Sequence, residues 1–169
     1  SNGNEDYYWG MGLTAEEVAK EYKINREDQD IFAFNSHQKA LSAIENKKFD
    51  SQIAPINVEE IYLDENSIKK TRNHTYTQDE GPRKDTSIEA LSKLRPVFSS
   101  TGSVTAGNSS QMSDGAAFVM IASESYIKTH NIEPIARLIN YSVAGLPPKI
   151  MGVGPIKAIP KVLDKTNLK

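Results

Sequence analysis

The chain has 169 residues, of which 38% are hydrophobic and 25% charged, and its formal net charge is −2. These values are typical of a globular protein, disfavour disordered and collagen-like chains, and argue against a general affinity for nucleic acids. Because the sequence holds no cysteine, disulfide bonds, zinc–thiolate sites and a thiol nucleophile are excluded within this chain.

The first part of the chain is expected to be mainly helical. Thr14, with Glu17 three residues on, has the form of a capping box and predicts a short helix through about Tyr22. A longer helix is predicted over residues 26–45, with Asn25 as its cap and acidic residues in its first turn. Its apolar residues recur at helical spacing and form one stripe: Ile31, Phe34, Leu41 and Ile44.

The middle of the chain is expected to hold a strand, a long loop and a short helix. Loosely alternating apolar residues, with Pro55 near the start, predict an edge strand over residues 53–63. Residues 64–86 are almost wholly polar and predict a long surface loop. Ser87 is expected to cap a short helix that ends before Pro96.

Two strands are predicted in the second half of the chain. Residues 116–122 form an apolar run of strand length, as in a strand covered on both faces. Ser123 is expected to cap a helix that reaches about His130. Residues 135–143 show partial alternation and predict the second strand.

The chain is expected to end with a loop and a helix. Residues 145–154 contain two prolines and predict the loop, and Pro155 suits the first turn of the helix. Pro160 is expected to kink or shorten that helix. Strands and helices alternate in the second half only, so the pattern predicts an α/β fold with α+β character in the first half.

No catalytic or metal-binding residues are predicted within the chain. His37, His74 and His130 lack acidic or cysteine partners at metal-ligand spacing, so we expect them to be structural or solvated. The Gly-x-Ser-x-Gly elbow of hydrolases is also missing from the sequence.

Seven basic residues gather in a short and otherwise polar span, and two interpretations stay open. They form either a solvated surface with balancing acids or a site for an anionic small molecule such as a phosphate. The residues are Lys69, Lys70, Arg72, Arg83, Lys84, Lys93 and Arg95.

The most distinctive run, Gly102 to Ala117, is rich in small, amide and hydroxyl residues. Such a run predicts either the close approach of another molecule or a tight connection before a buried strand. Within it, Ser103-Val104-Thr105-Ala106-Gly107-Asn108-Ser109-Ser110 and Ser113-Asp114-Gly115-Ala116-Ala117 resemble the pantetheine-binding segment of thiolases, the acyl-CoA acetyltransferases.

Other motifs resemble the same family, in its order and at its approximate spacing, and together they cover nearly the whole chain. They are Gly10-Met11-Gly12-Leu13-Thr14-Ala15-Glu16, Lys93-Leu94-Arg95-Pro96-Val97-Phe98 and Met151-Gly152-Val153-Gly154-Pro155. The motif Asp79-Glu80-Gly81-Pro82-Arg83 is closer to degradative 3-ketoacyl-CoA thiolases than to biosynthetic ones.

The resemblance implies contacts with coenzyme A. It implies that Ser110 hydrogen-bonds the pantetheine chain and that the backbone of Ala106 and Gly107 lies against it. It places Arg83 at the adenosine-phosphate end and Leu94 in the same binding set.

Two methionines belong to that implied set: Met11 in the wall of the pantetheine tunnel and Met151 in the acyl pocket, although both also suit simple packing. Gly10 and Ala90 depart from residues of some thiolases, a histidine and a serine respectively, so contacts with the nucleotide are expected to differ.

In the family, a cysteine attacks the acyl thioester, an oxyanion hole stabilises the tetrahedral state, and a second cysteine with a histidine moves the proton. Neither cysteine is in this sequence. The resemblance therefore implies an inactive central fragment of a parent that cleaves 3-ketoacyl-CoA with coenzyme A, or condenses acetyl-CoA in reverse, with acyl-CoA as substrate and no permanent cofactor. Ser1-Asn2-Gly3 is expected to be a cloning remnant.

The implied domains are a coenzyme A-binding loop domain over residues 1–112, the returning strand and helix of the first core domain over 113–134, and the start of the second core domain over 135–169. We expect a homo-oligomer with no nucleic-acid or membrane partner, in fatty-acid β-oxidation, in the cytoplasm of a bacterium or an organelle of a eukaryote. The alternative is a noncatalytic coenzyme A- or lipid-binding or oligomerisation module of the same fold.

Overall fold

The structure, a computed structural model, describes residue 3 and residues 5–166. The chain forms two compact units: residues 1–25, 96–106 and 110–169 make the first, and residues 26–95 with 107–109 make the second. The remnant expected at Ser1 and Asn2, and the last three residues of the domain expected over 135–169, lie outside the described residues.

Helices dominate the first unit, and two of them pack against one 3-10 helix. Both α1 and α5 contact η3, as does the short η1. The bounds of these elements are Glu5–Tyr8 for η1, Met11–Glu21 for α1, Glu124–His130 for α4, Pro148–Val153 for η3 and Gly154–Thr166 for α5.

Helix α1 begins at Met11, so the capping box predicted at Thr14 is wrong. The carbonyl of Gly10 accepts the amides of Leu13 at 3.0 Å and Thr14 at 3.3 Å, which adds nearly one turn before the predicted start. Thr14 is 5% exposed, and its hydroxyl donates to the Met11 carbonyl at 2.8 Å. A hydroxyl bonded inside the helix cannot cap it.

The core of the first unit is small and joins α1, η3 and the segment around residue 104. Its buried apolar residues are Ala19, Val104, Ile150 and Val153. A Cβ at Gly12 would overlap the ring of Phe98, so the missing side chain lets α1 approach that ring. Beside it, Pro96 and Thr105 form an antiparallel bridge, and the Val97 amide donates to the Val104 carbonyl at 3.0 Å.

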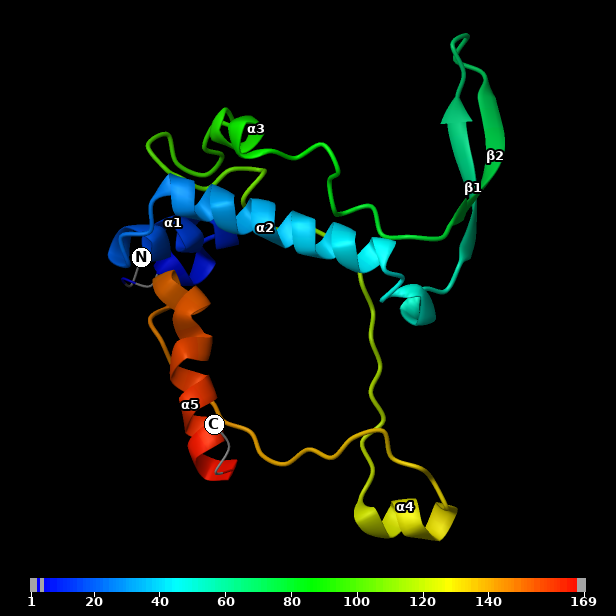
Figure 1. Cartoon of the computed structure of the whole chain (residues 1–169), viewed down its shortest axis with the longest axis vertical. Coiled ribbons are helices and arrows are strands. Elements are labelled where there is room, and N and C mark those ends of the chain that lie inside the picture. The colour runs from blue at the N-terminus through cyan, green and yellow to red at the C-terminus, as the bar shows by residue number, and fades with distance from the viewer. Residues whose placement is uncertain (1–2, 4, 167–169) are drawn as a thin grey trace. The chain divides into compact units, whose positions relative to one another are not determined.

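Neither of the two strands predicted in the second half of the chain forms. Residues 116–122 and 135–143 have no strand assignment and run as plain chain on both sides of α4 (Figure 1). Phe118 is 99% exposed and Ile135 is fully exposed. A strand requires a hydrogen-bonded neighbour, and within residues 5–166 neither segment has one.

Helix α4 forms where its cap predicts. The Ser123 hydroxyl accepts the Tyr126 amide at 3.2 Å. The helix ends at His130, and Asn131 follows in the left-handed region with φ 51°. A local capping signal therefore holds here although the flanking strand predictions fail.

The end of the first unit differs from the prediction in its loop, which is partly helical. The expected loop over residues 145–154 contains the 3-10 helix η3, which begins directly after Pro147. Helix α5 then runs through Pro160 to Thr166, so the proline does not end it.

The second unit contains two helices, a short 3-10 helix and a β-hairpin. Helix α2 has the predicted bounds, and α3 is capped by Ser87, whose hydroxyl accepts the Ala90 amide at 3.1 Å. Helices α2 and α3 contact each other. The bounds are Arg26–Glu45 for α2, Asp50–Gln52 for η2, Ile56–Leu63 for β1, Lys69–Tyr76 for β2 and Ile88–Ser92 for α3.

The predicted stripe of α2 is only half-buried. Ile31 is 40% exposed, and Phe34, Leu41 and Ile44 have intermediate exposure. The one residue of α2 that is fully buried is the charged Asp30.

The loop predicted over residues 64–86 is wrong in its first part, because Lys69–Tyr76 forms the strand β2. It pairs antiparallel with β1, from Ile56 opposite Tyr76 to Leu63 opposite Lys69 (Figure 1). At the turn, the Asp64 carboxylate accepts the amides of Asn66 at 2.9 Å and Ile68 at 3.0 Å. Most residues of β2 are exposed in the two-stranded hairpin, so the strand does not need apolar side chains. Without a buried face, the sequence has no alternation to reveal the strand.

Candidate functional site

In the first unit, Glu16 of α1 holds the start of the distinctive run. Its carboxylate accepts the amides of Ser103 at 2.9 Å and Val104 at 2.8 Å, and the Ser103 hydroxyl donates at 3.3 Å. Charge-assisted bonds to backbone amides are stronger than neutral ones. The side chain of Glu16 therefore fixes the backbone just before Thr105, which is fully buried.

In the second unit, Asp30 of α2 holds a later part of the same run. One carboxylate oxygen accepts Nε of Arg26 at 2.8 Å, and the other accepts the Asn108 amide nitrogen at 3.0 Å. Nη2 of Arg26 donates to the carbonyls of Leu91 at 2.6 Å and Leu94 at 2.9 Å. These bonds connect α2, the segment 107–109 and the end of α3.

Four residues of the predicted coenzyme A set lie in the first unit, and all are exposed. Met11 begins α1 and is 66% exposed, and Met151 lies in η3 and is 47% exposed. The helices that carry these methionines pack against each other. Ala106 and Ser110 are exposed, and the Ser110 hydroxyl donates to the Gln111 carbonyl at 3.2 Å.

Three residues of that set lie in the second unit. Gly107 has intermediate exposure, and the side chain of Leu94 is on the surface with the residue 38% exposed. The side chain of Arg83 is 67% exposed and forms two hydrogen bonds with Asp85, at 3.2 and 3.0 Å. The Arg83 amide donates to Nδ1 of His37 at 3.1 Å, which ties this loop to α2.

The pair Arg83–Asp85 is electrostatically matched. The hydrogen bond from Arg83 lowers the pKa of Asp85, and the same bond raises the pKa of Arg83. A phosphate that binds Arg83 must therefore compete with a carboxylate already in place.

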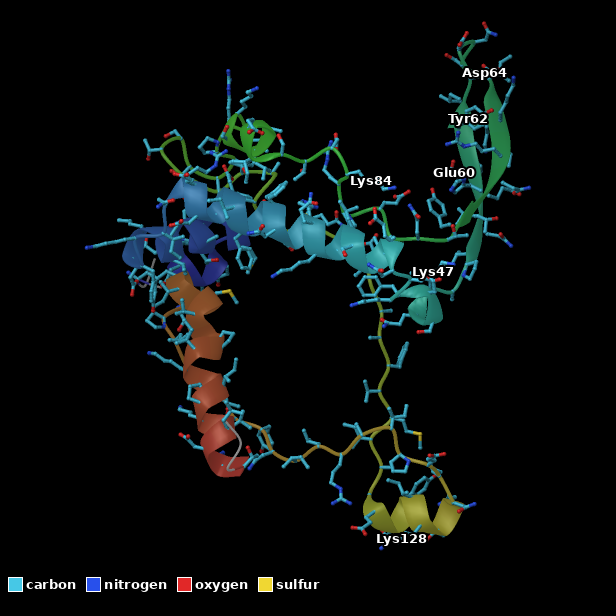
Figure 2. The ribbon with its side chains drawn as sticks, viewed as in Figure 1. Lys47, Glu60, Tyr62, Asp64, Lys84 and Lys128 are labelled. Atoms are coloured by element: carbon cyan, nitrogen blue, oxygen red, sulfur yellow. The ribbon has the colours of Figure 1, made fainter. Side chains whose placement is uncertain are left out.

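Two basic residues of the hairpin are also paired with acids. Arg72 bonds Glu60 at 2.6 Å, and Lys70 bonds Asp64 at 2.9 Å. Figure 2 labels Glu60 and Asp64, together with Tyr62, on the hairpin. For Lys70 and Arg72 these bonds favour the interpretation of a solvated surface with balancing acids.

Hydrogen bonds shift the pKa of both hairpin acids. The Tyr76 hydroxyl, at 2.6 Å, and then Arg72 lower the pKa of Glu60. Lys70, and then the Ile68 amide, lower the pKa of Asp64. Both carboxylates thus stay ionised to a lower pH in the folded hairpin.

Sequence reasoning missed Glu16, Asp30 and Asn108 as structural anchors of the run. The available signal was the spacing of Arg26 and Asp30, four residues apart on one helix face. Glu17, the acid expected in the capping box, instead lies 3.7 Å from Lys149. Bonds that join residues 78 to 88 positions apart leave no local pattern.

Residues 5–166 have neither a cluster of metal-binding side chains nor a helix that could cross a membrane. No cluster of three or more histidine or acidic side chains in this part of the chain has the arrangement of a metal site. Each of its helices is too short or too polar to traverse a lipid bilayer.

Comparison with protein families gives a match to the thiolase N-terminal domain over residues 5–125. Among curated proteins, the chain is 44% identical over 164 residues to a 3-ketoacyl-CoA thiolase of Bacillus subtilis. That match covers 97% of this chain and 42% of the relative.

Two solved structures are similar over nearly the whole chain. The dimeric peroxisomal thiolase of Saccharomyces cerevisiae has a TM-score of 0.81 and 42% identity, covering 100% of this chain and 40% of that one. A human mitochondrial 3-ketoacyl-CoA thiolase in complex with CoA has a TM-score of 0.80 and 39% identity, covering 98% of this chain and 38% of that one. The chain therefore spans about two fifths of the length of these relatives.

Proposed function

The chain belongs to the thiolase family, and from this premise we propose that it is the coenzyme A-binding part of an acyltransferase. The observation that carries the proposal is the 44% identity over 164 residues to a 3-ketoacyl-CoA thiolase, in a match that spans the run 103–117. A solved relative in complex with CoA supports the same ligand.

The proposed reaction of the whole protein is the cleavage of a 3-ketoacyl-CoA by coenzyme A, or its reverse. A cysteine thiolate attacks the 3-keto carbon, and the bond between carbons 2 and 3 breaks. The leaving carbanion takes a proton from a second cysteine and departs as acetyl-CoA. The thiol of coenzyme A then gives its proton to that second cysteine and takes the acyl group from the first cysteine, which leaves as a thiolate. Because this chain has no cysteine, the proposal places both catalytic cysteines in other parts of the polypeptide.

We propose that the run around residue 107 binds the pantetheine arm. The Ser110 hydroxyl is exposed and can hydrogen-bond a pantetheine amide. Ala106 and Gly107 present backbone with little or no side chain, which allows a ligand to approach closely. No metal or permanent cofactor enters the proposal.

The other residues of the set receive roles by their chemistry. Arg83 binds a phosphate of coenzyme A by exchanging its Asp85 partner for the ligand. Met11, Leu94 and Met151 contact apolar parts of the substrate, and their exposed fractions of 66%, 38% and 47% support contact with a ligand more than a role in the core.

The proposed domains are the loop domain over residues 1–112, a returning strand and helix over 113–134 and the start of a second core domain over 135–169. In this proposal the exposed segments 116–122 and 135–143 become strands when other parts of the polypeptide pair with them. The dimeric yeast relative supports a homodimer of the whole protein. Fatty-acid breakdown, in a bacterial cytoplasm or a eukaryotic organelle, is the proposed setting.

The test is an assay of the complete reading frame that encodes this chain. We expect thiolysis of acetoacetyl-CoA or a longer 3-ketoacyl-CoA, and we expect the 169-residue chain alone to have no turnover and to bind coenzyme A more weakly than micromolar, because most of the preorganised site is missing. A complete protein that has both cysteines and no turnover would contradict the proposal. A complete protein without cysteines that binds coenzyme A would instead support the noncatalytic module.

A further inference from the structure

We infer that Asp30 is a positioning residue for coenzyme A binding: it holds the segment 107–109 and the end of α3 in one arrangement. The inference rests on the proposed function, since it concerns the same ligand. Asp30 does not itself contact the ligand in this account. It acts through Asn108, next to Gly107, and through Arg26, which binds the carbonyl of Leu94.

The first support is the burial of the charge. Asp30 is 3% exposed, whereas the side chain of its partner Arg26 is 25% exposed. Burying a carboxylate is costly unless its oxygens are paired and hydrogen-bonded. Both oxygens of Asp30 are paired here, one with a guanidinium and one with an amide.

The second support is what the partners of Asp30 bind. Arg26 joins the carboxylate to two backbone carbonyls near the end of α3, at 2.6 and 2.9 Å. Asn108 joins it to the run that the proposed function assigns to pantetheine. One buried side chain thus links the backbone at Leu94 to the segment that holds Gly107, and both residues belong to the proposed binding set.

An isosteric change tests this arrangement with little loss of packing. In Asp30→Asn, the new amide has one acceptor oxygen and one donor nitrogen. Its oxygen can accept from the Arg26 guanidinium, but its nitrogen cannot accept from the Asn108 amide nitrogen that now bonds Asp30. The variant therefore loses the present bond to Asn108 unless the Asn108 amide rotates to offer its oxygen, and either change alters how the segment 107–109 is held.

The experiment uses the complete protein and three single variants: Asp30→Asn, Asn108→Ala and the control Glu27→Gln. The control makes the same charge change at an exposed position of the same helix. For Asp30→Asn we expect the KM for coenzyme A to rise about 10- to 100-fold with kcat within about threefold, because a displaced binding group weakens binding of substrate and transition state alike. Asn108→Ala leaves the Arg26–Asp30 ion pair intact and should raise the same KM. It therefore tests the inference even if Asp30→Asn fails to fold.

A double variant, Asp30→Asn with Asn108→Asp, exchanges the donor and acceptor of the second bond. The new amide oxygen can accept from Arg26 while its nitrogen donates to the new carboxylate. We expect the KM to return to within about fivefold of wild type, a rescue that general destabilisation would not produce. Hydrogen exchange of the amides at 107–109 should be faster in Asp30→Asn and in Asn108→Ala than in the control Glu27→Gln.

The outcomes separate the two ideas. If the wild-type complete protein has no thiolysis and no coenzyme A binding, the proposed function fails and this inference fails with it. If the wild type is active while Asp30→Asn and Asn108→Ala keep a normal KM and normal exchange at 107–109, only the positioning role is overturned.

Discussion

Strand β2 of the hairpin and the extended segments 116–122 and 135–143 received opposite sequence predictions, and the structure reverses both. The polar residues of β2 form a strand, whereas the apolar residues of both segments do not. The hairpin closes over a short turn, so its pairing costs little loop entropy and is complete within the chain. The comparison teaches that a local partner decides whether a strand forms, while apolar character indicates only what a strand would bury.

The same contrast applies to side chains. In the described part of the second unit, Glu60, Asp64 and Asp85 all have basic partners nearby in the sequence. Phe118 and Ile121, by comparison, are 99% and 88% exposed. Contiguous exposed apolar residues mark surfaces that bind another part of a protein.

The largest expected effect is that of a charge placed at Phe118, in the segment 116–122. In the complete protein, Phe118→Asp should lower the free energy of unfolding by at least about 3 kcal/mol, because the proposed strand would bury an unpaired carboxylate. In the 169-residue chain the same change should cost almost nothing, since Phe118 is already exposed. Urea unfolding of both proteins measures the difference, and equal effects in the two would rule out a buried strand at residues 116–122.

The second prediction concerns Glu16, which holds the start of the run at Ser103 and Val104. Glu16→Gln should lower the free energy of unfolding by about 1.5–3 kcal/mol, because the charged carboxylate that accepts the Ser103 and Val104 amides becomes a neutral amide. Urea denaturation followed by circular dichroism measures it. Glu17→Gln is the matched control on the same helix, and its pair with Lys149 at 3.7 Å should be worth less than about 1 kcal/mol. Equal losses in the two variants would contradict the anchoring role of Glu16.

The third prediction is that the stability of the hairpin depends on pH. The pKa values of Glu60 and Asp64 are lowered in the folded hairpin from 4.5 and 3.8, so their contribution to stability is present above those values and is lost as the pH falls through the folded pKa values. The pKa of Tyr76 is raised from 10.0 by its bond to Glu60, so its contribution is present below pH 10.0 and is lost as the pH rises through the folded value.

The measurement is the NMR shift dispersion of the hairpin amides between pH 7 and pH 2, with Glu60→Gln as the test variant. The wild-type hairpin should lose dispersion on acidification, and the variant should show a smaller change. The amides of segment 116–122, within which no residue is acidic or basic, are the internal control. A hairpin equally ordered at both pH values would contradict the assigned pairing.

Local signals in the sequence predicted much of the fold. Helix α2 has its predicted bounds, and Ser87 and Ser123 cap the helices expected from them. These features depend on hydrogen bonds that span only a few residues. The motifs at residues 10–16 and 103–117 likewise predicted the family, which the match over residues 5–125 confirms.

The failures lie where distant or missing partners decide the outcome. The start of α1 depends on the Gly10 carbonyl rather than on the stronger capping residue Thr14. The bonds from Glu16 to Ser103 and from Asp30 to Asn108 cross more than seventy residues and have no periodic signature. The proposed roles of the site residues stay predictions, since the family match identifies the fold and not the contacts of single side chains.

The smallest expected effect concerns Arg83, whose charge is already matched within the chain. Asp85→Asn should increase the affinity for coenzyme A by no more than about fivefold, because exposed ion pairs are weak and screened by salt. The gain should be larger for coenzyme A than for dephospho-coenzyme A if Arg83 binds the 3′-phosphate, and calorimetric titration of the complete protein with both ligands measures it. Arg83→Gln should abolish the difference between the ligands, because the phosphate then has no cation to bind at this position. An unchanged preference in Arg83→Gln would remove Arg83 from the binding set while leaving the family assignment intact, since that rests on residues 5–125 as a whole.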